Sequence, residues 1–83
     1  MPPDPRIEVV KKAPRKALVQ FGKNLNKTRL HAKLSQEQLA VKADFTRRYI
    51  QNLESGQKSP TLFALKRLTT ALKCSYQDLL NGV

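Results

Sequence analysis

The sequence predicts an all-α fold of five helices in one domain of 83 residues. Apolar residues recur every three or four positions over most of the chain, which is the period of one helix face. Between these stretches lie Ser and Thr residues of the kind that begin helices, and Gly or Asp residues of the kind that end them. No segment shows a convincing strand pattern, and apolar residues make up 40% of the chain, which is enough for a compact core.

The first helix is expected from Arg15 to about Ala32. Pro14 suits its start, because the missing N–H of proline costs nothing in the first turn of a helix. The apolar positions of this segment fall on one helix face: Leu18, Phe21, Leu25 and Ala32. Gly22 weakens the helix by up to ~1 kcal/mol relative to Ala, and it would let another backbone approach closely.

The second helix is expected to begin after Ser35, whose hydroxyl can cap it while Gln38 completes a capping box. Its inward residues are Leu39, Ala40 and Ala43. Asp44 should end it, because a short polar side chain tolerates the left-handed backbone of a tight turn.

A third helix is expected from Arg47 to about Glu54, with Thr46 as its cap and Gly56 as its C-terminal stop. Two short helices separated by the tight turn Ala43-Asp44-Phe45 form a helix-turn-helix arrangement. The small side chain of Ala40 lets the helices cross closely. The buried positions of the third helix are Ile50 and Leu53, and its outward positions are Arg47, Arg48, Gln51 and Asn52.

These outward side chains are of the types that read DNA bases. Arg makes paired hydrogen bonds to guanine, and Asn or Gln makes them to adenine. Thr46 and the N–H groups at the start of the helix can meet phosphates. For any single residue, the simpler interpretation is an ordinary helix with charged residues in solvent. The whole stretch 35–56 instead favours a helix edge that reads a DNA groove.

The fourth helix is expected to open at Ser59-Pro60-Thr61, with an apolar face of Leu62, Leu65, Leu68 and Leu72, supported by Ala64 and Ala71. A short fifth helix is expected from Ser75 to Leu80. The residues that it presents are Tyr76, Leu79 and Leu80. They complete either the core or a subunit interface.

Positive charge is in excess, with 16 Lys plus Arg, 6 Asp plus Glu and a formal net charge of +10. Residues 1–33 hold nine basic and two acidic side chains, whereas residues 34–83 hold seven and four. Such an excess points to a polyanionic partner, either nucleic acid or an anionic membrane face.

Several other classes of protein are excluded. One Cys and one His cannot make a four-ligand zinc site, and with three glycines there is no Gly-rich phosphate loop. No titratable residues stand at a catalytic spacing, so we expect no enzyme, no metal and no cofactor. No apolar run approaches the ~18 residues of a membrane span, and the first residues do not resemble a signal peptide. We expect a cytoplasmic protein.

The segment LSQEQLAVKADFTRRYIQNLESGQKSPTLFALKRLTTALKCSYQDLL resembles the Cro/C1-type (Xre) helix-turn-helix family, which includes lambdoid phage repressors and controller proteins of restriction–modification systems. The resemblance covers roughly Gly22 to Leu80. It implies a five-helix lambda-repressor-like domain that regulates transcription as repressor, activator or both. It also implies a homodimer that binds double-stranded DNA at a palindromic operator, with the recognition helix in the major groove. No small-molecule effector is evident from the sequence.

The resemblance, read with the residue types, also implies roles for individual residues. The residues expected to contact DNA bases are Arg47, Arg48 and Asn52. The residues expected to contact the DNA backbone or to support these contacts are Gln36, Thr46, Tyr49, Gln51, Ser55, Gln57 and Lys58. Arg29 and Glu54 stand where relatives form a largely buried ion pair, and the fifth helix, with Tyr76, Leu79 and Leu80, stands where relatives dimerise. Lys33 and Asp44 occupy positions where the family usually has Gly.

Residues 15–83 form the expected helix-turn-helix domain, and residues 1–14 are a basic extension outside the resemblance. The end of this extension and the start of the first helix together carry a basic cluster, which consists of Lys11, Lys12, Arg15 and Lys16. This cluster is either an arm that binds DNA or the flank of a segment, Ile7–Val10, that packs on the domain or across a dimer. Two rival functions stay open. One is an antitoxin-type interaction module that also binds its own promoter, and the other is a non-specific nucleic-acid binder.

Overall fold

The computed structural model describes residues 14–83. This part of the chain forms five helices: α2 (Arg15–His31), α3 (Gln36–Ala43), α4 (Arg47–Glu54), α5 (Leu62–Leu72) and α6 (Tyr76–Leu80). No strand occurs between residues 14 and 83, so the predicted all-α class and the five predicted helices are confirmed.

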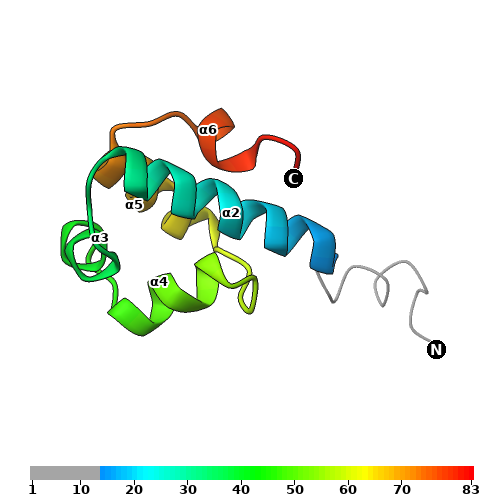
Figure 1. Ribbon diagram of the computed structural model, residues 1–83, viewed down its shortest axis with the longest axis horizontal. Coiled ribbons are helices and arrows are strands. Elements are labelled where there is room, and N and C mark those ends of the chain that lie inside the picture. Colours follow the sequence, from blue (N-terminus) through cyan, green and yellow to red (C-terminus); the bar gives the residue numbers. More distant parts are fainter. Residues whose placement is uncertain (1–13) are drawn as a thin grey trace, which may run out of the picture.

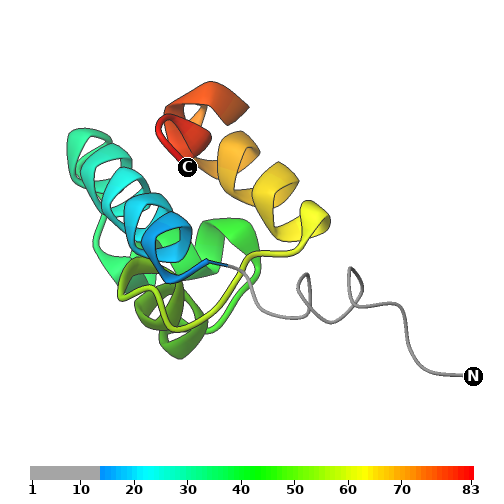
Figure 2. The same cartoon turned by 90° about the vertical axis from the view of Figure 1, so that its right-hand side faces the viewer.

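The long helix α2 runs through the middle of the molecule and organises the others (Figure 1). It packs against α4 on one side and α6 on the other, while α3 packs against both α4 and α5. Viewed from the end of the molecule, α5 lies across from α2, with α3 and α4 below them (Figure 2). The helix-turn-helix pair α3–α4 is thus mounted on α2 and α5.

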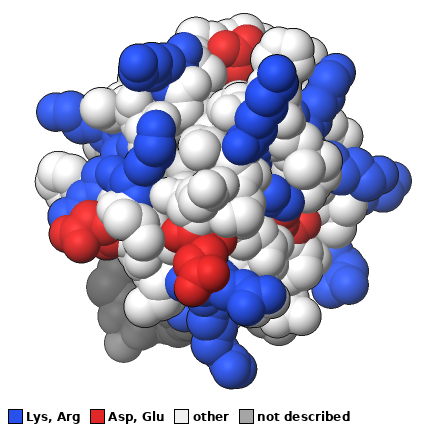
Figure 3. All heavy atoms as spheres, turned by 60° about the vertical axis from the view of Figure 1, so that its left-hand side comes forward, with Lys and Arg blue, Asp and Glu red and all other residues white. Residues whose placement is uncertain are grey.

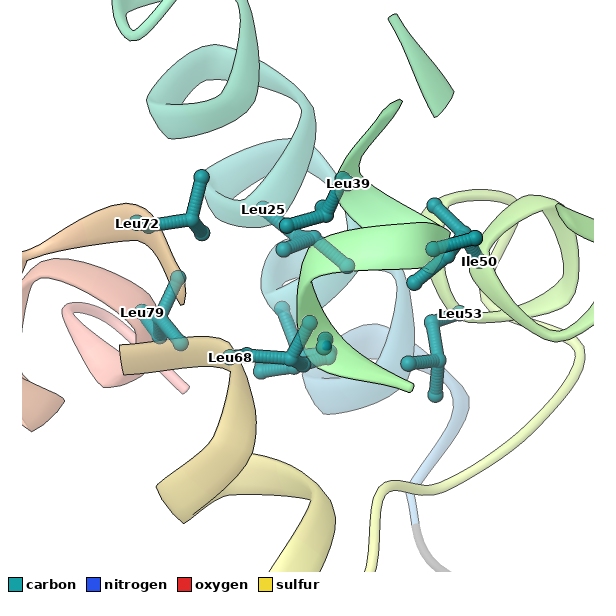
Figure 4. Close-up of a cluster of buried hydrophobic side chains, with 10 residues drawn as sticks. Leu25, Leu39, Ile50, Leu53, Leu68, Leu72 and Leu79 are labelled. Atoms are coloured by element: carbon teal, nitrogen blue, oxygen red, sulfur yellow. The ribbon is translucent and has the colours of Figure 1, made fainter. Parts of the chain in front are cut away.

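One cluster of buried side chains joins all five helices (Figure 4). Its members, each under 8% exposed, are Phe21, Leu25, Leu39, Ala40, Ala43, Ile50, Leu53, Leu68, Leu72 and Leu79. Some residues expected on the buried helix faces lie outside this cluster. Leu18 is only partly buried. Leu62 is 74% exposed, because the buried stripe of α5 runs through Ala64, Leu68 and Leu72 in steps of four. Ala32 is exposed, because it lies just beyond the last residue of α2.

The predicted caps explain where these helices begin. The Ser35 hydroxyl accepts from the N–H of Gln38 at 3.0 Å, and the Gln38 side chain accepts from the N–H of Ser35 at 2.8 Å. Thr46 Oγ1 accepts from the N–H of Tyr49 at 3.1 Å, which caps α4. These bonds satisfy donors that the first helical turn leaves without a backbone partner.

Within residues 14–83, three corners hold a non-glycine residue in the left-handed region: Lys33 (φ 61°), Asp44 (φ 59°) and Lys73 (φ 52°). The corner at Lys33 closes α2, because the N–H of Leu34 donates to the carbonyl of Arg29 at 3.2 Å. The short polar side chain of Asp44 predicts a left-handed backbone there, and that prediction is confirmed.

Lys33→Gly is expected to raise the free energy of unfolding by about 0.5–1 kcal/mol. A left-handed conformation costs an L-residue more than the extra unfolded-state entropy of glycine costs the variant. Urea denaturation measures the change. Lys27→Gly, in the middle of α2, is the matched control and should lose about 1 kcal/mol. Equal losses in both variants would contradict the prediction.

Candidate nucleic-acid interface

Helix α4 has one face fixed in the core and the opposite face in solvent. Ile50 and Leu53 have no exposed surface. Arg47, Arg48 and Gln51 of this eight-residue helix are all exposed. Asn52 was expected on the same outer edge but is half-buried. The outer edge of α4 therefore combines two guanidinium groups and an amide on a helix that cannot rotate.

An aromatic pair supports the start and the flank of α4. The rings of Phe45 and Tyr49 lie 4.7 Å apart between centroids and pack against the core. Lys58 places its ammonium 6.0 Å from the Tyr49 ring centre, and Arg67 from α5 lies 5.4 Å from that of Phe45. Both distances are within the range of cation–π attraction. Half-buried Tyr49 is thus positioned to support Lys58.

The turn after α4 carries exposed polar residues. Ser55, Gln57 and Lys58 are all exposed, and Gly56 takes the left-handed conformation, with φ 78°, that turns the chain. The N–H of Gln57 donates to the carbonyl of Asn52 at 2.9 Å. The hydrogen bond fixes this turn against the last turn of α4, so these three side chains project from a defined backbone.

The ion pair between Arg29 and Glu54 is present and buried. Arg29 Nε lies 2.6 Å from Glu54 Oε2 and Nη2 lies 3.1 Å from Oε1, while Nη1 donates to the carbonyl of Leu34 at 2.8 Å. Less than a tenth of either side chain is exposed. The pair ties α2 to the last residue of α4 and to the loop before α3.

Two amides complete the surroundings of the Glu54 carboxylate. Asn26 Nδ2 donates to Oε1 at 2.8 Å, and Gln36 Nε2 donates to the same atom at 3.2 Å. Gln36 is the first residue of α3, so its bond joins the two helices of the helix-turn-helix. Its expected supporting role has this physical basis. Sequence reasoning missed Asn26, because the carboxylate that it contacts lies 28 residues away in the sequence.

Burial alone would raise the pKa of Glu54. The hydrogen bonds from Arg29, Asn26 and Gln36, together with the Arg29 charge, outweigh burial and hold its pKa below the usual 4.5. A carboxylate with a lowered folded-state pKa stabilises the fold above its unfolded-state pKa.

We expect acid to remove this stabilisation. It should be fully present at neutral pH and should decline as the pH falls through 4.5 toward the lower folded-state pKa, because the unfolded chain takes up the proton first. Urea denaturation between pH 7 and pH 3 measures the decline. Glu54→Gln removes the titrating group, so its stability should depend less steeply on pH in this window. Identical slopes for the two proteins would contradict the assignment.

Lys and Arg side chains spread over the α3 side of the molecule, with acidic groups in only a few places (Figure 3). Arg15 and Lys16, at the start of α2, are exposed. Lys11 and Lys12 lie outside the described residues. In residues 14–83 no three His, Cys, Asp or Glu side chains come together in a group that could hold a metal ion. None of the helices in this range is long and apolar enough to cross a membrane.

The three residues expected at a subunit interface differ in how deeply they are buried. Leu79 is completely buried between α6 and the rest of the core, which corrects its expected place in an interface. A helix of five residues needs such an anchor to stay on α2 and α5. Tyr76 and Leu80 are 46% and 37% exposed. Phe63, which sequence reasoning did not consider, is 76% exposed beside Leu62. The polar residues Lys66, Arg67 and Thr70 share its helix face and were an available signal.

Comparisons with known proteins agree with this geometry. A family model described as helix-turn-helix matches residues 25–79. Control protein C.BamHI from Bacillus amyloliquefaciens is 34% identical over 62 residues, which are 74% of this chain and 76% of that protein. The HTH-type transcriptional regulator y4dJ from Sinorhizobium fredii is 33% identical over 58 residues, or 70% of this chain and 75% of that protein.

A solved structure extends the likeness to the fold. The crystal structure of the restriction-modification controller protein C.AhdI from Aeromonas hydrophila is 37% identical, with a TM-score of 0.72 over 75% of this chain and 94% of that one. These relatives are regulators and controller proteins rather than enzymes. The chain therefore belongs to the Cro/C1-type helix-turn-helix family and is a DNA-binding transcription regulator.

Proposed function

We propose that the protein binds a roughly palindromic operator as a homodimer and that α4 of each protomer enters the major groove. The outer edge of α4 carries this proposal, because Arg47, Arg48 and Gln51 are exposed while the opposite face is locked in the core. A helix fits the major groove, where each base pair presents a distinct pattern of donors and acceptors. Occupation of a promoter by this dimer would then control transcription.

In this arrangement Arg47 and Arg48 read guanine, and Asn52 reads adenine from the next turn of the helix. Residues at both ends of the helix-turn-helix contact the phosphate backbone of the DNA. Thr46 and Gln36 contribute at the helix starts, where the dipole favours an anion. The Thr46 hydroxyl uses a lone pair in its cap and keeps its proton to donate. Ser55, Gln57 and Lys58 contribute from the turn after α4, with Tyr49 and Gln51 beside them.

Two recognition helices related by a twofold axis would lie about 34 Å apart, one turn of DNA. Exposed apolar side chains support the second copy. Tyr76 and Leu80 form the interface that we propose, and the exposed pair Leu62 and Phe63 on α5 is the competing surface. Sedimentation velocity of the double variant Tyr76→Ala, Leu80→Ala should show dissociation, and Phe63→Ala should not. The opposite result would move the interface to α5.

The basic extension is proposed as an arm on the DNA, with exposed Arg15 and Lys16 at its junction with α2. Deleting residues 1–12 and measuring the slope of log K against log salt tests the arm. For each phosphate that the shortened protein no longer neutralises, the salt dependence of binding should flatten by roughly one unit of slope. An unchanged slope would reject the arm.

Selection of bound fragments from random duplex DNA should yield a symmetric site. On that site Arg47→Ala or Arg48→Ala is expected to cost about 1–3 kcal/mol and to relax base preference at one position. Lys27→Ala is the matched control, because it removes one positive charge from an exposed residue of α2. Its effect should be equal on all sequences.

Competition with random duplex DNA distinguishes specific binding from general attraction to nucleic acid. If random DNA competes as well as the selected site, the protein is a non-specific binder. If Arg47→Ala and Arg48→Ala weaken binding equally on every sequence, these residues hold phosphates rather than bases.

A further inference from the structure

The Glu54 carboxylate receives more hydrogen bonds on one oxygen than that oxygen needs. Oε2 accepts from Arg29 Nε alone. Oε1 accepts from three groups, namely Asn26 at 2.8 Å, Arg29 Nη2 at 3.1 Å and Gln36 at 3.2 Å. A carboxylate oxygen has about two lone-pair directions. One of the three donors is therefore in excess, and the Gln36 bond is the longest.

Of the three donors, Gln36 is the one that stands at the start of a helix, where an anion is favoured. Arg29 is buried and donates through its remaining terminal nitrogen to the carbonyl of Leu34. Asn26 belongs to the middle of α2, which is fixed along its length by α4 and α6. Gln36 is the first residue of α3, where the helix dipole favours an anion. Its amide can leave Glu54 while Oε1 keeps two donors.

We propose that Asn26 is a positioning residue for DNA binding: its amide keeps the buried Glu54 oxygen satisfied, so that the Gln36 amide is released to a DNA phosphate. The inference rests on the proposed function, in which the first turn of α3 meets the DNA backbone. Asn26 itself touches no DNA in this scheme. It acts on the phosphate contact by substituting for Gln36 at Glu54.

Without Asn26, Gln36 could not leave freely. Release of its amide would leave Oε1 with one donor from Arg29, and a buried acceptor that loses partners carries a desolvation penalty. DNA binding would then have to overcome this penalty. We expect Asn26→Leu, which keeps the side-chain size and removes the donor, to weaken operator binding roughly 3- to 10-fold, as expected for the loss of about one net hydrogen bond.

A double-mutant cycle tests the mechanism. Operator dissociation constants are measured for the wild type, Asn26→Leu, Gln36→Ala and the double variant, all shown to be folded by urea denaturation at the assay temperature. Gln36→Ala should weaken binding, and Asn26→Leu should have no further effect in the Gln36→Ala background. Equal effects of Asn26→Leu in both backgrounds, or no effect in either, would overturn the proposal. Asn26→Ala replaces Asn26→Leu if the latter does not fold.

A second readout follows the carboxylate directly. The Glu54 pKa, measured by NMR in the free protein, should be higher in Asn26→Leu than in the wild type, because a donor to the charged form is removed. An unchanged pKa would show that Asn26 does not act through Glu54. Arg47→Ala is assayed in parallel. If it changes sequence preference while Asn26→Leu has no effect, only this inference fails, and if it leaves preference intact, the proposed function fails.

Discussion

Glu54→Leu is expected to lower the free energy of unfolding by about 3–5 kcal/mol, the cost of leaving one member of a buried ion pair without its partner. Arg29 is 8% exposed, and its guanidinium would lose both of its bonds to the carboxylate. The amides of Asn26 and Gln36 would lose the same acceptor. Equilibrium urea denaturation of the variant measures the loss.

Two further variants distinguish the loss of the Arg29–Glu54 ion pair from a general effect of replacing Glu with Leu. Arg29→Met combined with Glu54→Leu should recover much of the missing stability, because no unpaired charge stays buried. Glu37→Leu removes an exposed carboxylate in the first turn of α3 and should cost less than 1 kcal/mol. A double variant that is less stable than Glu54→Leu alone would contradict the buried-charge explanation.

Gly22→Ala is expected to destabilise the protein by about 1–3 kcal/mol, although Ala favours a helix by up to ~1 kcal/mol. A Cβ at this position would lie 2.3 Å from the backbone oxygen of Glu54 and 2.8 Å from that of Leu53. Backbone atoms at the end of α4 cannot rotate away as a flexible side chain could. The helices α2 and α4 must therefore separate, and this also moves the outer edge of α4.

Two measurements test this prediction. Urea denaturation gives the stability, and binding to the selected operator should fall even where the variant is fully folded. Lys23→Ala is the matched control, since it alters the next residue of α2, which is exposed, and should change stability by less than 0.5 kcal/mol. If Gly22→Ala is as stable as the wild type or more so, α2 and α4 do not require this close approach.

Local chemistry made much of this fold predictable. Ser35 and Thr46 cap helices where their side chains predict it, because capping depends on residues within three positions. Asp44 takes the expected left-handed conformation for a similarly local reason. The interpretation of Gly22 as a site of close approach is also confirmed, since α4 lies directly against it.

Other features of the structure could not be predicted from the spacing of apolar residues. Leu62 shares the spacing of the buried leucines, yet Ala64 occupies the inward direction in the first turn of α5. Asn26 is separated by 28 residues from the carboxylate it contacts. No local pattern predicts such a bond, and the pairing of Arg29 with Glu54 was itself expected only from the family resemblance.

The division of α4 into a locked face and an open face has a consequence for how such a protein diversifies. Ile50 and Leu53 hold the helix, and Glu54 anchors its end, while Arg47, Arg48 and Gln51 contribute nothing to the core. Exchange of those three side chains leaves the scaffold intact. If α4 reads bases as proposed above, a lineage built on this domain can acquire new target sites through substitutions at Arg47 and Arg48 while the fold stays stable.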